Sequence, residues 1–288
     1  MTSHVAEAGN GQAASAGTSA MLPSIWRLAL VSTRLELKAF FREKGAIAFV
    51  FSLPAVLLLL LGSILKNLAA APGSPITMGQ LLAAGLIGGG IAATSFQYLG
   101  IAIATERDRL WLKRLRGTPM PRVAYFLGKI GEVIVSTLAE TVLLIVVGIL
   151  VDHITLPSTA GQWWTVAWVL ILGATCCTLL GIAASSVPRS ARSALGVITM
   201  PFVVLQFISG VYVPQTLVPS WLGDIAAYFP LKWITQGLRS AFLPSSAAQL
   251  EPSHTWEHGR IALVLAAWTV AGLVLCMTTF RWRNRSDG

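Results

Sequence analysis

Charged residues are scarce in this sequence. Only 11% of its 288 residues are Asp, Glu, Lys or Arg, whereas 55% are hydrophobic and the mean hydropathy is +0.70. A soluble domain has about 25% charged residues, so this composition excludes an ordinary soluble domain and favours a membrane protein. The net charge of +9 could indicate nucleic acid, but the basic residues lie between apolar runs long enough to cross a bilayer. We therefore expect membrane lipid as a partner and no nucleic acid.

The common catalytic motifs are also missing. Neither the nucleotide-binding pattern G-x-x-x-x-G-K-[ST] nor the nucleophile elbow G-x-S-x-G occurs, so we expect no nucleotide hydrolysis by this chain itself. The three cysteines (Cys176, Cys177 and Cys276) lie inside apolar runs, where they are expected to pack as small hydrophobic side chains.

One pattern resembles a metal site. Residues 254–258 match the H-x-x-E-H motif of inverted zinc proteases, with His254, Glu257 and His258 as the candidate groups. A third ligand would have to come from downstream, where Asp287 is the only acidic residue of the sequence. We therefore expect polar loop residues here and no bound metal, and we keep an intramembrane enzyme as the least favoured alternative.

Six apolar runs are long enough to cross a membrane as helices. They lie at residues 46–65, 81–104, 125–150, 163–187, 194–213 and 261–280. At about 1.5 Å per residue, 20 residues of helix span the hydrocarbon core of about 30 Å. We predict an all-α polytopic membrane protein with a six-span transmembrane domain over residues 46–281.

The chain before the first span has two parts. Residues 1–22 are rich in Ala, Gly, Ser and Thr and lack the basic start and apolar stretch of a signal peptide, so we expect a disordered cytoplasmic tail. In residues 23–45, Arg27, Arg34 and Lys38 recur at helical spacing with apolar residues between them, which predicts a helix in the membrane interface. Residues 282–288 are expected to form a second cytoplasmic tail.

The positions of Lys and Arg orient the spans. If both termini are cytoplasmic, all but four of the 21 basic residues lie on the cytoplasmic side, and the exceptions are Lys66, Lys232, Arg239 and Arg260. Cytoplasmic loops carry an excess of Lys and Arg. We therefore predict a multi-pass protein of the cell (inner) membrane with both termini in the cytoplasm.

A charged segment, residues 105–118, separates the second and third spans. Leu115 stands four residues after Trp111 and three after Leu112, so a short helix here would have one apolar edge among basic side chains. Pro119 and Pro121 follow and would end it. A helix of this kind can lie on a membrane or dock into another protein, and we favour docking.

Prolines interrupt the connection between the fifth and sixth spans. Pro214, Pro219 and Pro230 divide residues 214–243 into apolar pieces too short to cross a bilayer. Such backbone is tolerated at membrane depth only against protein or a water-filled cavity. We predict re-entrant helices that form a gate, with Trp221 as a further member.

Several polar side chains fall within the predicted spans. Glu140 lies at mid-span, where a carboxylate costs about 2.5–3.5 kcal/mol on insertion scales, so it should face a cavity or a partner. Ser95, Gln97 and Gln206 are less costly. All four could line a substrate path or form hydrogen bonds between helices. Glu140 could also support a proton-coupled secondary transporter, which is the alternative function.

Two segments, together with the span count, resemble a known family. The first contains Glu106-Arg107 and then residues 112–121, with the sequence LKRLRGTPMP. The second begins FISGVYVP at Phe207 and continues through Pro219-Ser220-Trp221-Leu222, Phe229-Pro230-Leu231 and Leu238-Arg239. In these features the chain, from about Ile25 onward, resembles the type 2 permeases of ATP-binding cassette (ABC) exporters, such as multidrug and antibiotic exporters.

The resemblance implies a transport subunit rather than an enzyme. It implies a second permease, identical or different, and separate cytoplasmic ABC ATPase subunits that hold ATP and Mg, with no cofactor on this chain. Residues 105–118 would be the coupling helix, although family members often carry Gly-Thr where this sequence has Leu110-Trp111. Short outer loops favour a hydrophobic or amphiphilic cargo. The implied ATPase-docking residues are Glu106, Arg107, Trp111, Leu112, Lys113, Leu115 and Arg116.

Overall fold

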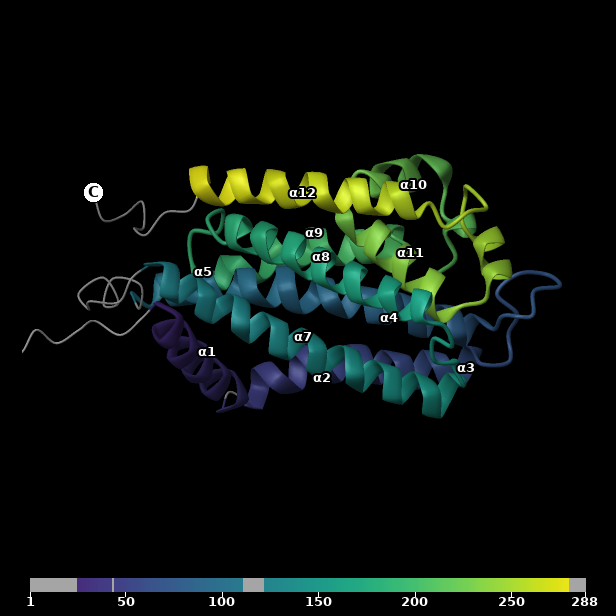
Figure 1. The fold of residues 1–288 in the computed structure, drawn as a ribbon, viewed down its shortest axis with the longest axis horizontal. Helices are drawn as coiled ribbons and strands as arrows, with labels where there is room; N and C mark the ends of the chain where they lie inside the picture. The colour runs from purple at the N-terminus through teal and green to yellow at the C-terminus, as the bar shows by residue number, and fades with distance from the viewer. Residues whose placement is uncertain (1–24, 43, 111–121, 280–288) are drawn as a thin grey trace, which may run out of the picture.

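The computed structural model describes residues 25–42, 44–110 and 122–279, which form a bundle of long, roughly parallel helices (Figure 1). These ranges contain no β-strand, which confirms the predicted all-α class. In chain order the elements are α1 (Ile25–Arg42), α2 (Lys44–Leu57), the π-helix η1 (Leu58–Gly62), α3 (Ser63–Leu65), α4 (Met78–Ala92), the π-helix η2 (Ala93–Tyr98), α5 (Leu99–Asp108), α7 (Arg122–Asp152), α8 (Ala160–Ala184), α9 (Ala191–Ile208), the 3₁₀-helix η3 (Gln215–Leu217), α10 (Ser220–Ala227), α11 (Pro230–Phe242), the 3₁₀-helix η4 (Ser245–Leu250) and α12 (His258–Thr279).

Five helical stretches of the described chain are long and apolar enough to cross a membrane. They are Met78–Asp108, Val123–Asp152, Ala160–Ala184, Ala191–Ile208 and His258–Thr279, and they correspond to the second to sixth predicted spans. The predicted first span is helical throughout, since α2, η1 and α3 follow one another directly, but its apolar stretch, Phe51–Leu65, is shorter. The chain is therefore a polytopic membrane protein, and the count of six spans stays a prediction.

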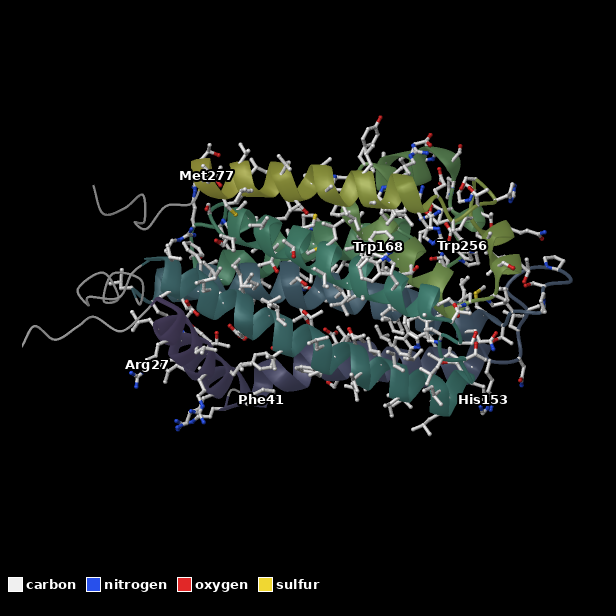
Figure 2. All side chains as sticks on the ribbon, viewed as in Figure 1. Arg27, Phe41, His153, Trp168, Trp256 and Met277 are labelled. Carbon is white, nitrogen blue, oxygen red and sulfur yellow. The ribbon has the colours of Figure 1, made fainter. Side chains whose placement is uncertain are left out.

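The helices have two recognisable ends. α1 and the C-terminal ends of α5 and α12 lie together at one end of the bundle, at the left of Figure 1. The chain between α3 and α4 and the segment from α10 to η4 lie toward the other end. Figure 2 places Arg27 near the first end and both His153 and Trp256 near the second. If the termini are cytoplasmic, as predicted, the first end is the cytoplasmic one.

Polar caps and prolines explain several helix starts. The Thr77 hydroxyl accepts a hydrogen bond from the Gln80 N–H at 3.2 Å, and the Gln80 side chain accepts one from the Thr77 N–H in return, which closes a capping box at α4. Pro219 directly precedes α10, and Pro230 is the first residue of α11. A proline is tolerated there because the first N–H groups of a helix have no partner within the helix.

The predicted fifth span ends earlier than residue 213. α9 stops at Ile208, and Gly210 adopts φ 80°, the left-handed conformation that favours glycine after a helix. The chain then turns back, so that the carbonyl of Val211 lies where a Cβ on Gly85 of α4 would be. The absence of a side chain at Gly85 thus allows the close approach of this turn.

α11 is a short helix in the interior of the bundle. It packs against α4, α8 and α12, and 11 of its residues are buried. Arg239 forms a 3.0 Å ion pair with Glu251, and both side chains are 1% exposed. The same guanidinium donates to the carbonyls of Gly210 and Val213, which joins α11 to the turn after α9. This protein-lined setting is what a non-spanning helix requires at membrane depth, and its depth in a bilayer stays a prediction.

Candidate functional site

A cluster of charged side chains joins three helices near the predicted cytoplasmic end. Lys129 of α7 is 2% exposed, and its Nζ lies 2.8 Å from Glu36 of α1, 3.5 Å from Glu132 of α7 and in direct contact with Glu106 of α5. The Tyr125 hydroxyl also donates to Glu106, at 2.7 Å. We refer to Lys129, Glu36, Glu106 and Glu132 as the Lys129 cluster.

The Lys129 cluster places three carboxylates around one ammonium group. Its pair between Lys129 and Glu132 is the contact expected from their i, i+3 spacing. Burial raises the pKa of the Glu36 carboxyl above its ordinary value, while attraction to Lys129 opposes that rise. Because its members come from α1, α5 and α7, the cluster fixes the end of α5 relative to two other helices.

The next residues of α5 contact the turn before α9. Arg107 is 8% exposed, and its Nη2 donates to the Pro188 carbonyl at 2.5 Å. The Asp108 carboxylate accepts a hydrogen bond from the Ala191 N–H at 3.0 Å, at the N-terminus of α9, where the helix dipole favours a negative charge. α5 ends at Asp108, and Leu110 follows with φ 58°. The end of α5 is thus bound to α9 as well as to α1 and α7.

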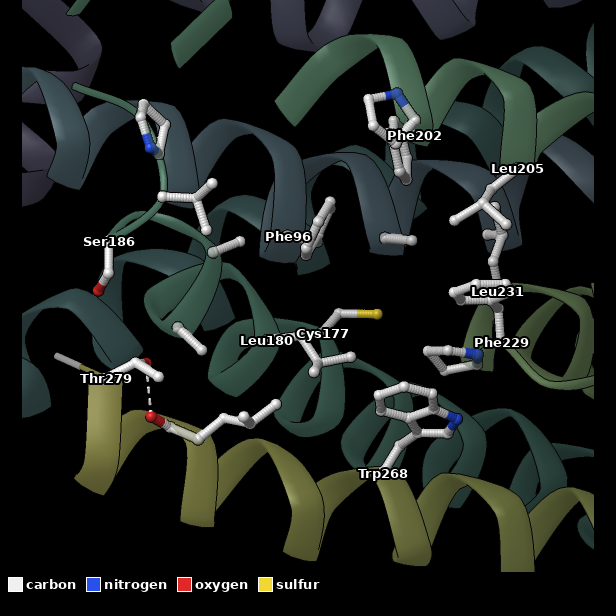
Figure 3. A pocket seen from close by; sticks show the side chains of 18 of the residues that line it. Phe96, Cys177, Leu180, Ser186, Phe202, Leu205, Phe229, Leu231, Trp268 and Thr279 are labelled. Atoms are coloured by element: carbon white, nitrogen blue, oxygen red, sulfur yellow. Dashed lines mark hydrogen bonds between the residues drawn. The ribbon is translucent and has the colours of Figure 1, made fainter. Parts of the chain in front are cut away.

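A cavity of about 880 Å³ lies between η2, α8, α9, α11 and α12 (Figure 3). Most of its lining is apolar and includes Phe96, Phe202, Leu231 and Trp268. Figure 3 shows Ser186 and Thr279 at one end of it and Phe229 and Trp268 at the other. The lining residues come from seven helical elements (α4, η2, α5, α8, α9, α11 and α12) and from the connections before α9 and α11, and most of them are ordinary apolar residues of membrane helices. Periodicity and motifs therefore gave no signal for this cavity.

These features coincide with a region that known proteins share. The ABC-2 type transporter family model matches residues 27–243, from α1 to just beyond α11. This chain belongs to the ABC-2 type transporter family. A search of curated proteins gave no match. The matched region includes the Lys129 cluster, the α5–α9 contacts and the turn held by Arg239.

Membership of this family confirms the resemblance seen in the sequence. The chain is a multi-pass membrane permease of an ABC transporter, and it carries no nucleotide-binding motif of its own. An ABC-2 permease works with ABC ATPase subunits.

The residues predicted to dock the ATPase lie partly outside the described chain. Trp111, Leu112, Lys113, Leu115 and Arg116 fall in residues 111–121, which the structure does not describe. Glu106 and Arg107 lie in the last turn of α5, so α5 continues past residue 105, where the coupling helix was expected to begin. Their side chains contact Lys129, Tyr125 and Pro188 of this chain.

Glu140 and Ser95, two of the four predicted path residues, are buried between α4, η2 and α7. The Glu140 side chain is 1% exposed and accepts a hydrogen bond from the Thr94 hydroxyl, while Ser95 donates to the Ile91 carbonyl. Gly90 lies against the Glu140 carboxyl, because an added Cβ would meet Oε1 at 2.8 Å. Within the described chain, neither residue borders the 880 Å³ cavity.

The other two predicted path residues, Gln97 and Gln206, also have partners in the protein. Gln97 donates to the Thr199 hydroxyl at 3.1 Å, and Gln206 accepts from the Tyr212 hydroxyl at 3.1 Å. Neither is among the described residues that border the cavity. The contacts of all four side chains are helix-to-helix or local hydrogen bonds, and their role in transport stays a prediction.

The gate and zinc-motif residues lie toward the predicted outer end. Pro214, Pro219 and Pro230 precede or begin short helices, and Trp221 is 62% exposed on α10. In the H-x-x-E-H segment, His258 Nε2 lies 3.0 Å from the Ser240 hydroxyl oxygen and His254 Nδ1 lies 3.3 Å from the Gln249 carbonyl. Across the described ranges, no three His, Cys, Asp or Glu side chains are grouped to hold a metal ion.

Proposed function

We propose that this chain is the permease subunit of an ABC exporter. It moves a hydrophobic or amphiphilic substrate, such as a drug, an antibiotic or a lipid-like molecule, out of the cytoplasm or the inner leaflet. Separate cytoplasmic ATPase subunits, which hold ATP and Mg, drive the movement. A second permease, identical or different, completes the path.

The contacts at the end of α5 support this proposal. Residues 105–118 begin within the last turn of α5, which is held by the Lys129 cluster, by Pro188 and by the N-terminus of α9. A force applied to residues 111–116 by a docked ATPase would therefore reach α1, α7 and α9 together. Rigid helices joined in this way can move as a unit when a partner closes.

The composition of the cavity supports the substrate class. An apolar space of about 880 Å³ bordered by Phe96, Phe202 and Trp268 suits a hydrophobic molecule, since ligand sites bury most of their ligand against apolar side chains. We take the cavity as a candidate place for cargo or lipid within the permease.

Substitutions in the proposed coupling helix test the ATPase contact. Trp111→Ala and Leu115→Ala remove its apolar edge, so we expect normal insertion in the membrane and reduced co-purification of the ATPase subunits. Arg114→Ala, outside the apolar edge of the predicted helix, is the matched control and should reduce co-purification less. Unchanged co-purification and unchanged ATP-driven transport in both apolar variants would remove the docking proposal.

A substitution of Glu140 distinguishes an ATP-driven exporter from a proton-driven transporter. Its contact with Thr94 and Gly90 is a helix-packing contact, so we expect Glu140→Gln to keep ATP-dependent transport in proteoliposomes, with at most a changed substrate range. Transport that needs a proton gradient but no ATPase, and that Glu140→Gln abolishes, would instead establish the secondary transporter.

A further inference from the structure

Two buried polar groups at the 880 Å³ cavity lack a hydrogen-bond partner. They are Nε of Arg107 and the hydroxyl of Ser186, and neither has a partner among the described residues. Both residues border the cavity. Arg107 is more than nine-tenths buried, and Pro188 engages only its Nη2. An unsatisfied donor on a buried guanidinium is unfavourable, so this end of the cavity is suited to an acceptor from outside the chain.

The charges around this end favour an anion. Arg189 also borders the cavity and is exposed. The nearby carboxylate, Asp108, is occupied by the Ala191 N–H at the start of α9. The hydroxyls of Thr278 and Thr279 donate to carbonyls of α12, and they can still accept a hydrogen bond. Two arginine residues, and a serine whose hydroxyl has no partner among the described residues, therefore line this end.

The rest of the cavity is apolar. Beyond Ser186 its walls are formed by side chains such as Leu180, Phe202, Leu231 and Trp268 (Figure 3). A molecule that satisfied Arg107 and Ser186 with a negatively charged group would extend its remaining part along these side chains. An ion without an apolar part would leave most of the space unfilled.

We infer that this cavity binds an anionic amphiphile. Its phosphate or carboxylate lies at Arg107 and Ser186, and its hydrocarbon part lies along Phe202 and Trp268. Guanidinium groups bind such oxygens through charge-assisted hydrogen bonds. A phospholipid of the bilayer and a transported cargo share this chemistry. Binding itself does not depend on the proposed function, whereas the identification of the ligand as cargo rests on it.

Binding can be measured with phosphatidylglycerol and phosphatidylcholine that carry identical brominated acyl chains. Bromine quenches tryptophan fluorescence at contact, and the difference between the wild type and Trp268→Phe isolates the signal from the cavity. We expect phosphatidylglycerol to bind the purified full chain about tenfold more tightly than phosphatidylcholine, as one charge-assisted contact would give. Equal affinity for the two lipids would overturn the inference.

Variants then locate the two parts of the site. Arg107→Gln should remove the preference for phosphatidylglycerol, and Arg192→Gln, which changes an exposed arginine outside the cavity lining, should keep it. Ser186→Ala should weaken the preference even if Arg107→Gln fails to fold. Ala184→Phe fills the cavity and should reduce the Trp268 signal for both lipids. Binding that is insensitive to Ser186→Ala and Ala184→Phe would overturn the proposed location.

The source of the ligand is decided with the ATPase subunits present. Loss of bound phosphatidylglycerol during ATP turnover identifies a transported molecule, and retention identifies a resident lipid; both agree with an anionic amphiphile in the cavity. If the complex shows no ATP-driven export at all, the proposed function is wrong. The lipid-binding and variant measurements still test the anionic-amphiphile site, because they do not require transport.

Discussion

Replacement of Lys129 by methionine would test how firmly the end of α5 is held. Methionine keeps an unbranched apolar side chain but removes the ammonium group at the centre of the Lys129 cluster. Glu132, which is 3% exposed, would remain buried beside Glu36 and Glu106, which are 18% and 22% exposed. The three carboxylates would repel one another, or would have to bind protons to stay in place.

The size of the effect follows from this burial. Removal of one partner of a buried ion pair costs about 3–5 kcal/mol, mainly because the other charge stays buried without compensation. Glu36 and Glu106 can relax toward water because they are partly exposed, so we expect the lower end, about 3 kcal/mol. Lys129→Arg keeps the charge and should cost less, and Lys66→Met, at an exposed lysine, should change the stability by less than about 0.5 kcal/mol.

The cysteines of the chain provide the assay. Cys176 and Cys177 are buried and Cys276 is partly buried, so a thiol-reactive dye reports unfolding during titration with a denaturing detergent. If Lys129→Met unfolds at the same detergent fraction as Lys66→Met, the cluster does not hold the helices together. The proposed transmission from residues 105–118 to α1 and α7 would then lose its support.

Three further predictions use the same assay. Arg239→Met should lower the free energy of unfolding by about 3–5 kcal/mol, because it leaves Glu251 buried and unpaired. Arg260→Met, at an exposed arginine, is the control, and equal stability of the two variants would contradict the role of the Arg239–Glu251 ion pair. Gly210→Ala should cost about 1–2 kcal/mol, because the φ of 80° is unfavourable for alanine, and an unfolding midpoint like that of the wild type would argue against the turn. Burial raises the pKa of the Glu36 carboxyl above 4.5. The folded state therefore binds the proton of this group more tightly than the unfolded chain does. The stability that the group contributes is present below pH 4.5 and is lost as the pH rises through the raised pKa. Glu36→Gln should therefore lose less stability than the wild type as the pH rises from 4.5, and parallel pH profiles would show that this group does not contribute.

Much of the fold could be read from hydropathy. The second to sixth predicted spans coincide with long helices because any long apolar segment in lipid must satisfy its own backbone hydrogen bonds, which a helix does locally. Pro219 and Pro230 fall at helix starts for an equally local reason. The end of α9 was predicted less well, because hydropathy continues to Val213 whereas the helix stops where Gly210 turns the chain back.

The roles of polar residues were harder to predict. Glu140 and Gln206 were considered for a substrate path because of their depth in the spans, and their partners in the structure are Thr94 of η2 and Tyr212 of the turn after α9. The i, i+3 spacing of Lys129 and Glu132 indicates their mutual contact, because it is local. The contacts of Lys129 with Glu36 and Glu106 join residues far apart in the chain, and no sequence pattern predicts such contacts.

The sequence by itself determined that this chain is a helical membrane protein, because span length, the scarcity of charge and the proline positions act within a few residues of one another. Its permease role was indicated by the resemblance to a known family and not by these local properties. Only the tertiary structure decided that α1, α5 and α7 share one buried lysine, that α11 is held by Arg239 to the turn after α9, and that an apolar cavity ends at Arg107 and Ser186. These features depend on which helix faces are neighbours, and that choice comes from packing between segments that are distant in the chain.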